Sequence, residues 1–193
     1  MNKTLKYGLW LLVSGYGALS LYPFFILLFQ SFKTENEVWG RPFALPGEWI
    51  VSNFTTVWSK ANFEQYALNS VFVTAVTLAL SLLFGTMLGY ALSRMSFFAR
   101  KLHFALLMGV LLVPSSLLIV PVYVLSDSLG ILNTHLGLIL PYLASGIILP
   151  TILMKSVFDT VPKELCDAAC IDGCGEYRML FRIMAPIGLP MMA

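Results

Sequence analysis

Residues 65–93 read QYALNSVFVTAVTLALSLLFGTMLGYALS, a run of 29 residues without a single Asp, Glu, Lys or Arg. A helix of about 20 largely apolar residues crosses the ~30 Å hydrocarbon core of a bilayer, so this run is long enough to span a membrane. Three further charge-free runs, of 26, 25 and 27 residues, lie at 7–32, 102–126 and 128–154. The sequence therefore predicts an all-α fold, a polytopic membrane helical bundle, with spans at about 7–30, 69–93, 103–125 and 136–156.

The composition agrees with a membrane protein and excludes an ordinary soluble domain. Of the 193 residues, 58% are hydrophobic and 11% are charged, whereas roughly a quarter of the residues in soluble domains are charged. The net charge of +2 is small and the basic residues are scattered, so we expect no nucleic-acid partner. The first apolar run exceeds the ~7–15 residues of a signal-peptide core, which favours a membrane anchor over a cleaved leader.

The basic residues predict how the spans are oriented. If the N-terminus is cytoplasmic, nine of the 12 Lys and Arg residues fall on cytoplasmic segments and three fall on the other side. The positive-inside rule therefore places the N-terminus in the cytoplasm. Residues 31–66 then form an extracytoplasmic loop, and Trp39, Trp49 and Trp58 suit a segment that partly lies against the membrane interface.

Prolines and small residues predict how the spans bend and pack. The third and fourth runs each contain two prolines, which interrupt a helix: Pro114, Pro121, Pro141 and Pro150. Either these helices line a path and bend, or neighbouring helices absorb the kinks. The second run has small residues that favour close helix packing, although they can also only add flexibility: Ala75, Ala79, Gly85, Gly89 and Ala91.

Charges return after residue 154 and mark an amphipathic segment outside the membrane. Pro162 suits a first helical turn, and Gly173 can end that helix in a left-handed conformation. A second helix is expected from about Gly175 to Pro186. Residues 158–190 are thus predicted to form a helix, a glycine corner and a second helix on the cytoplasmic face.

This segment carries a family resemblance. Residues 162–190, PKELCDAACIDGCGEYRMLFRIMAPIGLP, closely resemble the cytoplasmic loop signature of ATP-binding-cassette importer permeases. That signature is a Glu-Ala-Ala triplet, a Gly after three residues and Ile-x-Leu-Pro after nine more. The matching residues are Asp167-Ala168-Ala169, Gly173, Ile183 and Ala185-Pro186. Asp167 replaces the usual Glu, and Ala185 replaces the usual Leu.

The wider context resembles the carbohydrate-importer branch, the maltose-type permeases. Its motifs run from about residue 66 onward: Asn69-Ser70, Tyr90-Ala91-Leu92-Ser93-Arg94, Pro121-Val122-Tyr123, Leu129 to Thr134, Pro162-x-Glu164-Leu165 and Ile171-Asp172-Gly173. Permeases of this family continue past the loop with two further spans. We therefore expect residues 1–193 to be one permease transmembrane domain that lacks its last two spans and does not transport by itself.

The resemblance implies a function and partners. It implies a permease subunit of a multi-pass inner-membrane importer, for a sugar or oligosaccharide, that couples ATP hydrolysis by a partner to alternating access. The partners would be an ATPase dimer, a second permease, an extracytoplasmic solute-binding protein and the lipid bilayer. The residues expected to couple to the ATPase are Glu164, Asp167, Ala168, Ala169, Asp172, Gly173, Ile183 and Pro186. Ala168, Ala169 and Gly173 would form a small-residue face for docking in a groove, and Glu164 and Asp167 would orient it.

The chain itself is not expected to be an enzyme or to hold a cofactor. It has no Gly-x-x-x-x-Gly-Lys-Ser/Thr loop, so ATP and Mg²⁺ would be bound by the partner. No charged residue lies inside the four charge-free runs, which disfavours an intramembrane enzyme. Cys166, Cys170 and Cys174 are interpreted as small apolar fillers rather than as metal ligands. The alternative function is a membrane scaffold, or a non-transporting fragment that retains the docking loop.

Overall fold

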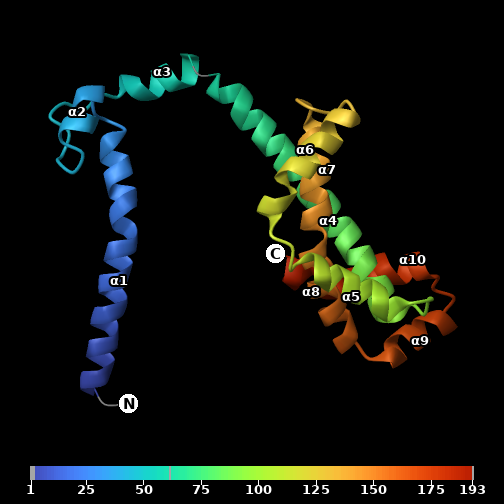
Figure 1. The fold of residues 1–193 in the computed structure, drawn as a ribbon. Helices are drawn as coiled ribbons and strands as arrows, with labels where there is room; N and C mark the ends of the chain where they lie inside the picture. Colours follow the sequence, from blue (N-terminus) through green and yellow to red (C-terminus); the bar gives the residue numbers. More distant parts are fainter. Residues whose placement is uncertain (1–2, 61, 193) are drawn as a thin grey trace. The chain divides into compact units, whose positions relative to one another are not determined.

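The computed structural model describes residues 3–60 and 62–192, and this part of the chain is helical without any β-strand (Figure 1). The chain divides into two compact units, one up to Ala67 and one from Leu68 onward. The helices are α1 (Lys3–Gln30), α2 (Glu35–Gly40), α3 (Ser52–Lys60), α4 (Phe63–Arg94), α5 (Arg100–Val110), α6 (Ile119–Ser128), α7 (His135–Gly146), α8 (Ile148–Thr160), α9 (Lys163–Ile171), α10 (Glu176–Met179) and α11 (Ala185–Met192). A short 3-10 turn, Ser115–Leu118, precedes α6, and a π-helical turn, Leu180–Met184, joins α10 to α11.

Three helical segments of the described residues are long and apolar enough to cross a membrane: Leu5–Gln30, Phe63–Arg94 and His135–Thr160. The third of these is α7 followed directly by α8. The range expected for the remaining span, 103–125, is instead occupied by α5 and α6, which are bent by 91° at the break between them. Pro114 lies in this break, where its missing N–H and fixed φ interrupt the helix. The pair adds a fourth crossing segment if it forms one broken span.

Two glycines allow α4 to approach α8 closely. A Cβ atom added at Gly85 would lie 2.6 Å from the Pro150 Cβ, and one added at Gly89 would lie 2.9 Å from the Met154 Cβ. The packing interpretation of these two residues is therefore confirmed. Ala75 and Ala79 are exposed on α4. The small residues therefore mark the contact with α8 only in the second half of α4.

The loop after α1 folds on itself through one buried lysine. The Lys33 side chain is 3% exposed, and its Nζ donates to the carbonyl oxygens of Arg41 and Pro42 at 2.8 and 3.3 Å. Asn53 Nδ2 donates to the carbonyl oxygen of Lys33 at 3.0 Å, which brings α3 back to the end of α1. The Phe32 ring packs against the Trp49 ring, with 5.2 Å between the ring centroids. Residues 31–60 thus form an ordered loop with two short helices.

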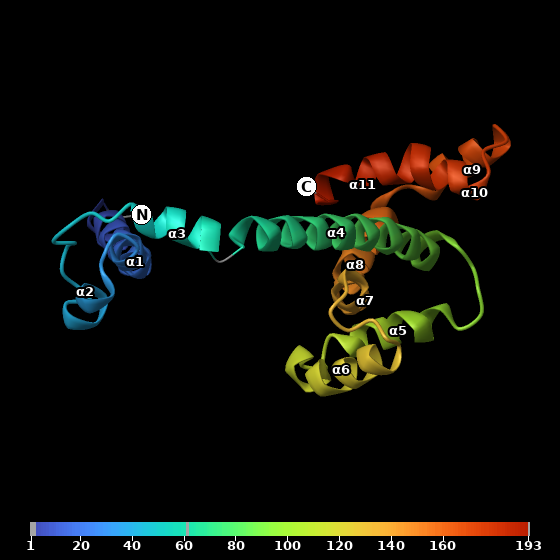
Figure 2. The same cartoon turned by 90° about the horizontal axis from the view of Figure 1, so that it is seen from above.

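Buried side chains of α4, α8, α9 and α10 form the core of the second unit; Figure 2 shows these helices from above. Tyr90, Met154, Phe158, Ala169 and Met184 are buried in one cluster there. The chain then continues as helix beyond the expected end of the second loop helix at Pro186, so that prediction is wrong. The Ala185 N–H bonds to the Leu180 carbonyl oxygen, which closes the π turn. Pro186 directly follows this π turn and is the second residue of α11, which continues to Met192.

Candidate functional site

The helix–glycine–helix segment, residues 163–179, is the part of the chain in which most predicted site residues lie. Its first helix, α9, follows Pro162, which is extended at φ −59° and ψ 140°. The helix ends in a Schellman motif: the Cys174 N–H donates to the Ala169 carbonyl oxygen at 2.9 Å and the Gly173 N–H to that of Cys170 at 3.0 Å. Gly173 has φ +77°, the left-handed conformation that the sequence predicted for this glycine.

One face of α9 points away from the protein. Glu164, Asp167, Ala168 and Ile171 are all exposed, and their spacing of i, i+3, i+4 and i+7 places them along a single stripe. We call these four residues the exposed stripe. It combines two carboxylates in the first half of the helix with a small residue and an apolar side chain in the second half.

The opposite face of α9 packs on the protein itself. Ala169 is 8% exposed and belongs to the buried cluster with Tyr90 and Phe158. Its methyl group therefore helps to seat α9 and does not extend the stripe, unlike the expectation that all three small residues share one docking face. Cys166 and Cys174 are half-buried against the same cluster, as expected for apolar fillers, whereas Cys170 is exposed.

The other predicted residues lie apart from the stripe. Asp172 and Gly173 are exposed at the corner directly after α9. Ile183 is half-buried in the π turn and Pro186 is exposed on α11, so these two belong to the second helix. Of the signature residues, Asp167 and Ala168 thus lie on the stripe, Ala169 lies on the buried face of α9, and Gly173, Ile183 and Pro186 lie after this helix.

Sequence reasoning missed Ile171 as part of this surface. Its side chain is 86% exposed, which is unusual for an isoleucine at the end of a short helix. The signal was available, because Ile171 lies three residues after Ala168 and four after Asp167, in helical register with both.

A polar network holds the helix–glycine–helix segment to the last two turns of α4. Arg94 Nη2 donates to the carbonyl oxygens of Phe158 and Val161, at the end of α8 and just before α9. The Tyr90 hydroxyl donates to Glu176 Oε2 at 2.5 Å, at the first residue of α10. These contacts join residues that are 64, 67 and 86 positions apart.

Asp159 completes this network at the end of α8. Its Oδ1 accepts from the Ser93 hydroxyl at 2.7 Å, and its Oδ2 pairs with Lys155 Nζ at 2.6 Å. The resembled motif Tyr90 to Arg94 was the sequence signal for these positions, although nothing in it indicates their partners. Among the residues described, no group of three His, Cys, Asp or Glu side chains could hold a metal ion.

An apolar cavity of about 550 Å³ lies beside this network. It is lined by α4 residues such as Phe84 and Leu88, by Ile147, and by Glu176 and Tyr177 of α10. The lining of this cavity contains one carboxylate, that of Glu176, which already accepts a hydrogen bond from the Tyr90 hydroxyl. The lining residues therefore offer no cluster of groups for acid–base chemistry.

The comparisons with known proteins agree on one family. The model of the binding-protein-dependent transport system inner membrane component matches residues 81–193. The chain is 37% identical, over 90% of its length, to the diacetylchitobiose uptake system permease protein of Streptomyces coelicolor, of which it covers 57%. It is 33% identical, over 95% of its length, to the arabinooligosaccharides transport system permease protein of Halalkalibacterium halodurans, of which it covers 68%.

A solved structure supports the fold. A chain of a bacterial ABC transporter involved in the import of the acidic polysaccharide alginate is similar with a TM-score of 0.81 at 22% identity. The alignment covers 97% of this chain and 66% of that one. The predicted all-α membrane bundle is thereby confirmed. The chain spans 57% of the Streptomyces relative and 61% of a probable ABC transporter permease protein of Bacillus subtilis. By these matches, the chain is a membrane protein that belongs to the family of inner membrane components of binding-protein-dependent transport systems.

Proposed function

We propose that this chain is the permease subunit of an ATP-binding-cassette importer for a sugar or oligosaccharide. Its relatives are named for diacetylchitobiose, arabinooligosaccharides and melibiose, raffinose and stachyose, which share a chemical class but no single substrate. ATP and Mg²⁺ would be bound by a partner ATPase dimer, and the chain would contribute no catalytic residue and no cofactor of its own. A second permease and an extracytoplasmic solute-binding protein would complete the importer.

The exposed stripe of α9 is the observation that carries this proposal. A short helix that presents an apolar side chain and small residues can dock in a groove of a partner protein. Ile171 would supply the buried contact, while Glu164 and Asp167 would meet basic groups at the rim and orient docking. Closure of the ATPase dimer on ATP would then push α9 and move the spans from an inward-facing to an outward-facing state.

The charges beside α9 support a cytoplasmic position for this segment. Arg94 ends α4 and contacts the backbone just before α9, Lys155 lies in the second half of α8, and Arg100 begins α5 after the following loop. The positive-inside rule places such residues in the cytoplasm, where an ATPase would reach the stripe. If α1 and α4 both cross the membrane, with the loop at 31–60 between them, this orientation would also put the N-terminus in the cytoplasm.

Co-purification tests the docking proposal. The chain, tagged at its N-terminus, is extracted from its own membranes in mild detergent and the bound proteins are quantified by mass spectrometry. Burial of an isoleucine side chain is worth ~1.5–3 kcal/mol, so Ile171→Glu should weaken docking by roughly ten-fold or more. Asp167→Lys should also lower ATPase recovery, because it reverses the charge that faces the basic rim.

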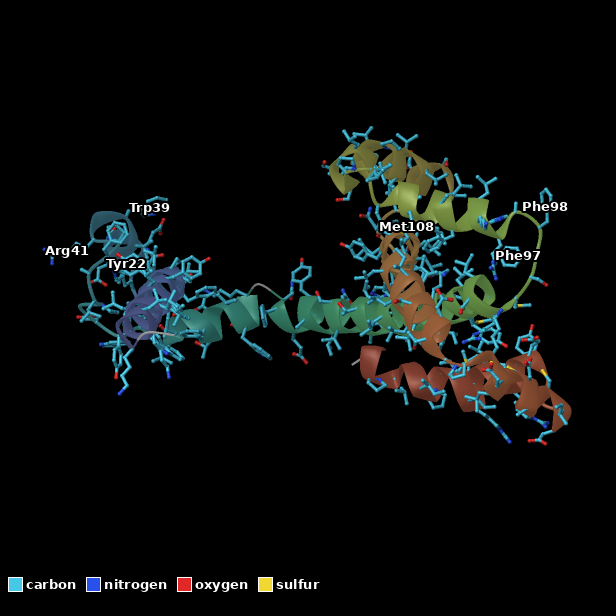
Figure 3. The ribbon with its side chains drawn as sticks, turned by 90° about the horizontal axis from the view of Figure 1, so that it is seen from below. Tyr22, Trp39, Arg41, Phe97, Phe98 and Met108 are labelled. Carbon is cyan, nitrogen blue, oxygen red and sulfur yellow. The ribbon has the colours of Figure 1, made fainter. Side chains whose placement is uncertain are left out.

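Phe98→Glu is the matched control. Phe98 is 94% exposed in the loop after α4 and projects away from the helices, as Figure 3 shows. This change adds the same charge at an exposed apolar residue outside the stripe, so ATPase recovery should equal that of the wild type. Equal recovery from all three variants, or no ATPase with the wild type, would refute the docking proposal.

The alternative of a membrane scaffold is not favoured, because relatives across the alignment are named as uptake or transport permeases. ATP-dependent accumulation of labelled oligosaccharides in cells tests this difference. A strain that loses uptake when the chain is deleted, and regains it with the wild-type gene, supports a permease. If deletion of the chain leaves the uptake of every tested oligosaccharide unchanged, the scaffold function is favoured over the permease function.

A further inference from the structure

The last two turns of α4 contact both ends of the helix–glycine–helix segment. Arg94 holds the backbone just before α9, and Tyr90 holds the first residue of α10. The segment between these two anchors contains the exposed stripe and the glycine corner. Its direction relative to α4 is therefore set at two points rather than by one hinge.

The first anchor lies at a junction that lacks support of its own. Within the described part of the chain, no side chain caps the start of α9, and Pro162 has no N–H to donate. The Phe158 carbonyl oxygen, in the last turn of α8, accepts from the Val161 N–H at 3.2 Å. Arg94 Nη2 donates to this same oxygen and to the carbonyl oxygen of Val161, which directly follows α8, and its positive charge suits a helix C-terminus. This one side chain therefore joins α4, α8 and the turn into α9.

The second anchor fixes the far side of the corner. Glu176 begins α10, and its carboxylate accepts the Tyr90 hydroxyl at 2.5 Å. Hydrogen bonds to a charged acceptor are roughly twice as strong as neutral ones. The Tyr90 ring is 3% exposed and packs edge-on against Phe158, at 6.2 Å between centroids, so the hydroxyl is held in place by buried contacts.

We propose that Arg94 and Tyr90 are positioning residues that make α9 and α4 move as one body. Force applied to the exposed stripe is then transmitted to the α4 span and is not absorbed by bending at residues 161–162 or 172–175. This inference rests on the proposed function for the source of the force. The rigidity itself is a property of this chain and can be measured without a partner.

The first measurement is the distance distribution between α4 and α9. Spin labels are placed at Leu83→Cys on α4 and Ile171→Cys on α9, which are exposed positions, after the three native cysteines are replaced by alanine. The chain is studied in lipid nanodiscs by pulsed electron spin resonance. The parent should give a single narrow peak, and Arg94→Gln should lose it and give a broad distribution. Arg94→Lys, which keeps a charged donor, should restore most of the narrow peak.

A milder variant covers the case in which Arg94→Gln fails to fold. Tyr90→Phe removes one hydroxyl and keeps the buried ring, so the fold should persist while the peak broadens. An unchanged distribution in Tyr90→Phe, together with an unchanged distribution in any folded Arg94→Gln, would overturn the proposal.

The second measurement separates positioning from a purely structural role. In membranes with the full set of partners, Tyr90→Phe and Arg94→Gln should retain the ATPase but lose sugar uptake per ATP hydrolysed. Arg94→Lys should restore part of the sugar uptake per ATP hydrolysed. A broad distance distribution with an unchanged ratio would refute the role in coupling. If Ile171→Glu and Asp167→Lys leave ATPase recovery unchanged, the docking proposal fails, whereas the distance measurement still decides the rigidity.

Discussion

The contact between α4 and α8 is tight enough that one added methyl group should separate the helices. A Cβ atom at Gly89 would lie 2.9 Å from the Lys155 backbone nitrogen, 2.9 Å from the Met154 Cβ and 3.0 Å from the Thr151 carbonyl oxygen. Two of these three atoms belong to the backbone, so they cannot rotate away. Non-bonded carbon atoms prefer separations of ~3.5–4.0 Å, so Gly89→Ala requires the helices to move apart by about 0.5–1 Å.

The cost can be worked out with a matched control. Overpacking costs ~1–3 kcal/mol, and a gain of ~1 kcal/mol in helix propensity for Gly to Ala partly offsets it. Gly109 in α5 has no described atom within 4 Å of an added Cβ, so Gly109→Ala should show the gain in propensity alone. The difference in unfolding free energy between the two variants removes the propensity contribution. Gly89→Ala should therefore be less stable than Gly109→Ala by about 1–3 kcal/mol.

Thiol labelling provides the assay. Cys166 and Cys174 are half-buried against the core where α4 and α8 meet, whereas Cys170 is exposed. A short pulse of a thiol reagent at increasing denaturant should label Cys170 throughout and the other two only as the unit opens. Midpoints that coincide for Gly89→Ala and Gly109→Ala would refute the reasoning, because the close approach of the helices would then carry no energetic consequence.

Two further substitutions test the core and the corner. Phe158→Ala removes a fully buried ring (0% exposed) and should destabilise the second unit by ~3–5 kcal/mol in the same labelling assay. Phe98→Ala, at a residue that is 94% exposed, should have little effect. Gly173→Ala forces an L-residue to φ +77° and should lower the free energy of unfolding by ~1–2 kcal/mol. Gly175→Ala, at φ −75°, should lower it by less. Equal losses of stability from the two variants would contradict the need for a left-handed conformation at Gly173.

The structure also changes which residues of the signature are exposed. Ala168, Ala169 and Gly173 were predicted to form one small-residue face, yet Ala169 is buried on the protein's own core. Consecutive residues on a helix point about 100° apart, so the three members of a triplet cannot all face the same way. Ile171 takes the place that Ala169 was expected to fill on the exposed stripe.

The sequence by itself determined the features that depend on local chemistry. Charge-free runs of more than 20 residues predicted membrane helices, because a bilayer sets the length of apolar chain that it can hold. Gly173 predicted the corner after α9, because only glycine adopts a left-handed conformation without cost. Pro114 likewise marked the break between α5 and α6.

Only the tertiary structure decided the contacts between distant residues. Arg94 and Tyr90 could be read as the polar end of a span, but their partners lie 64 to 86 positions away. Pro186 was expected to end a helix, whereas the π turn before it shifts the register so that the helix continues to Met192. Such outcomes depend on which backbone carbonyl groups the packed helices leave without a partner, and the pattern of residue types along the chain does not contain that information.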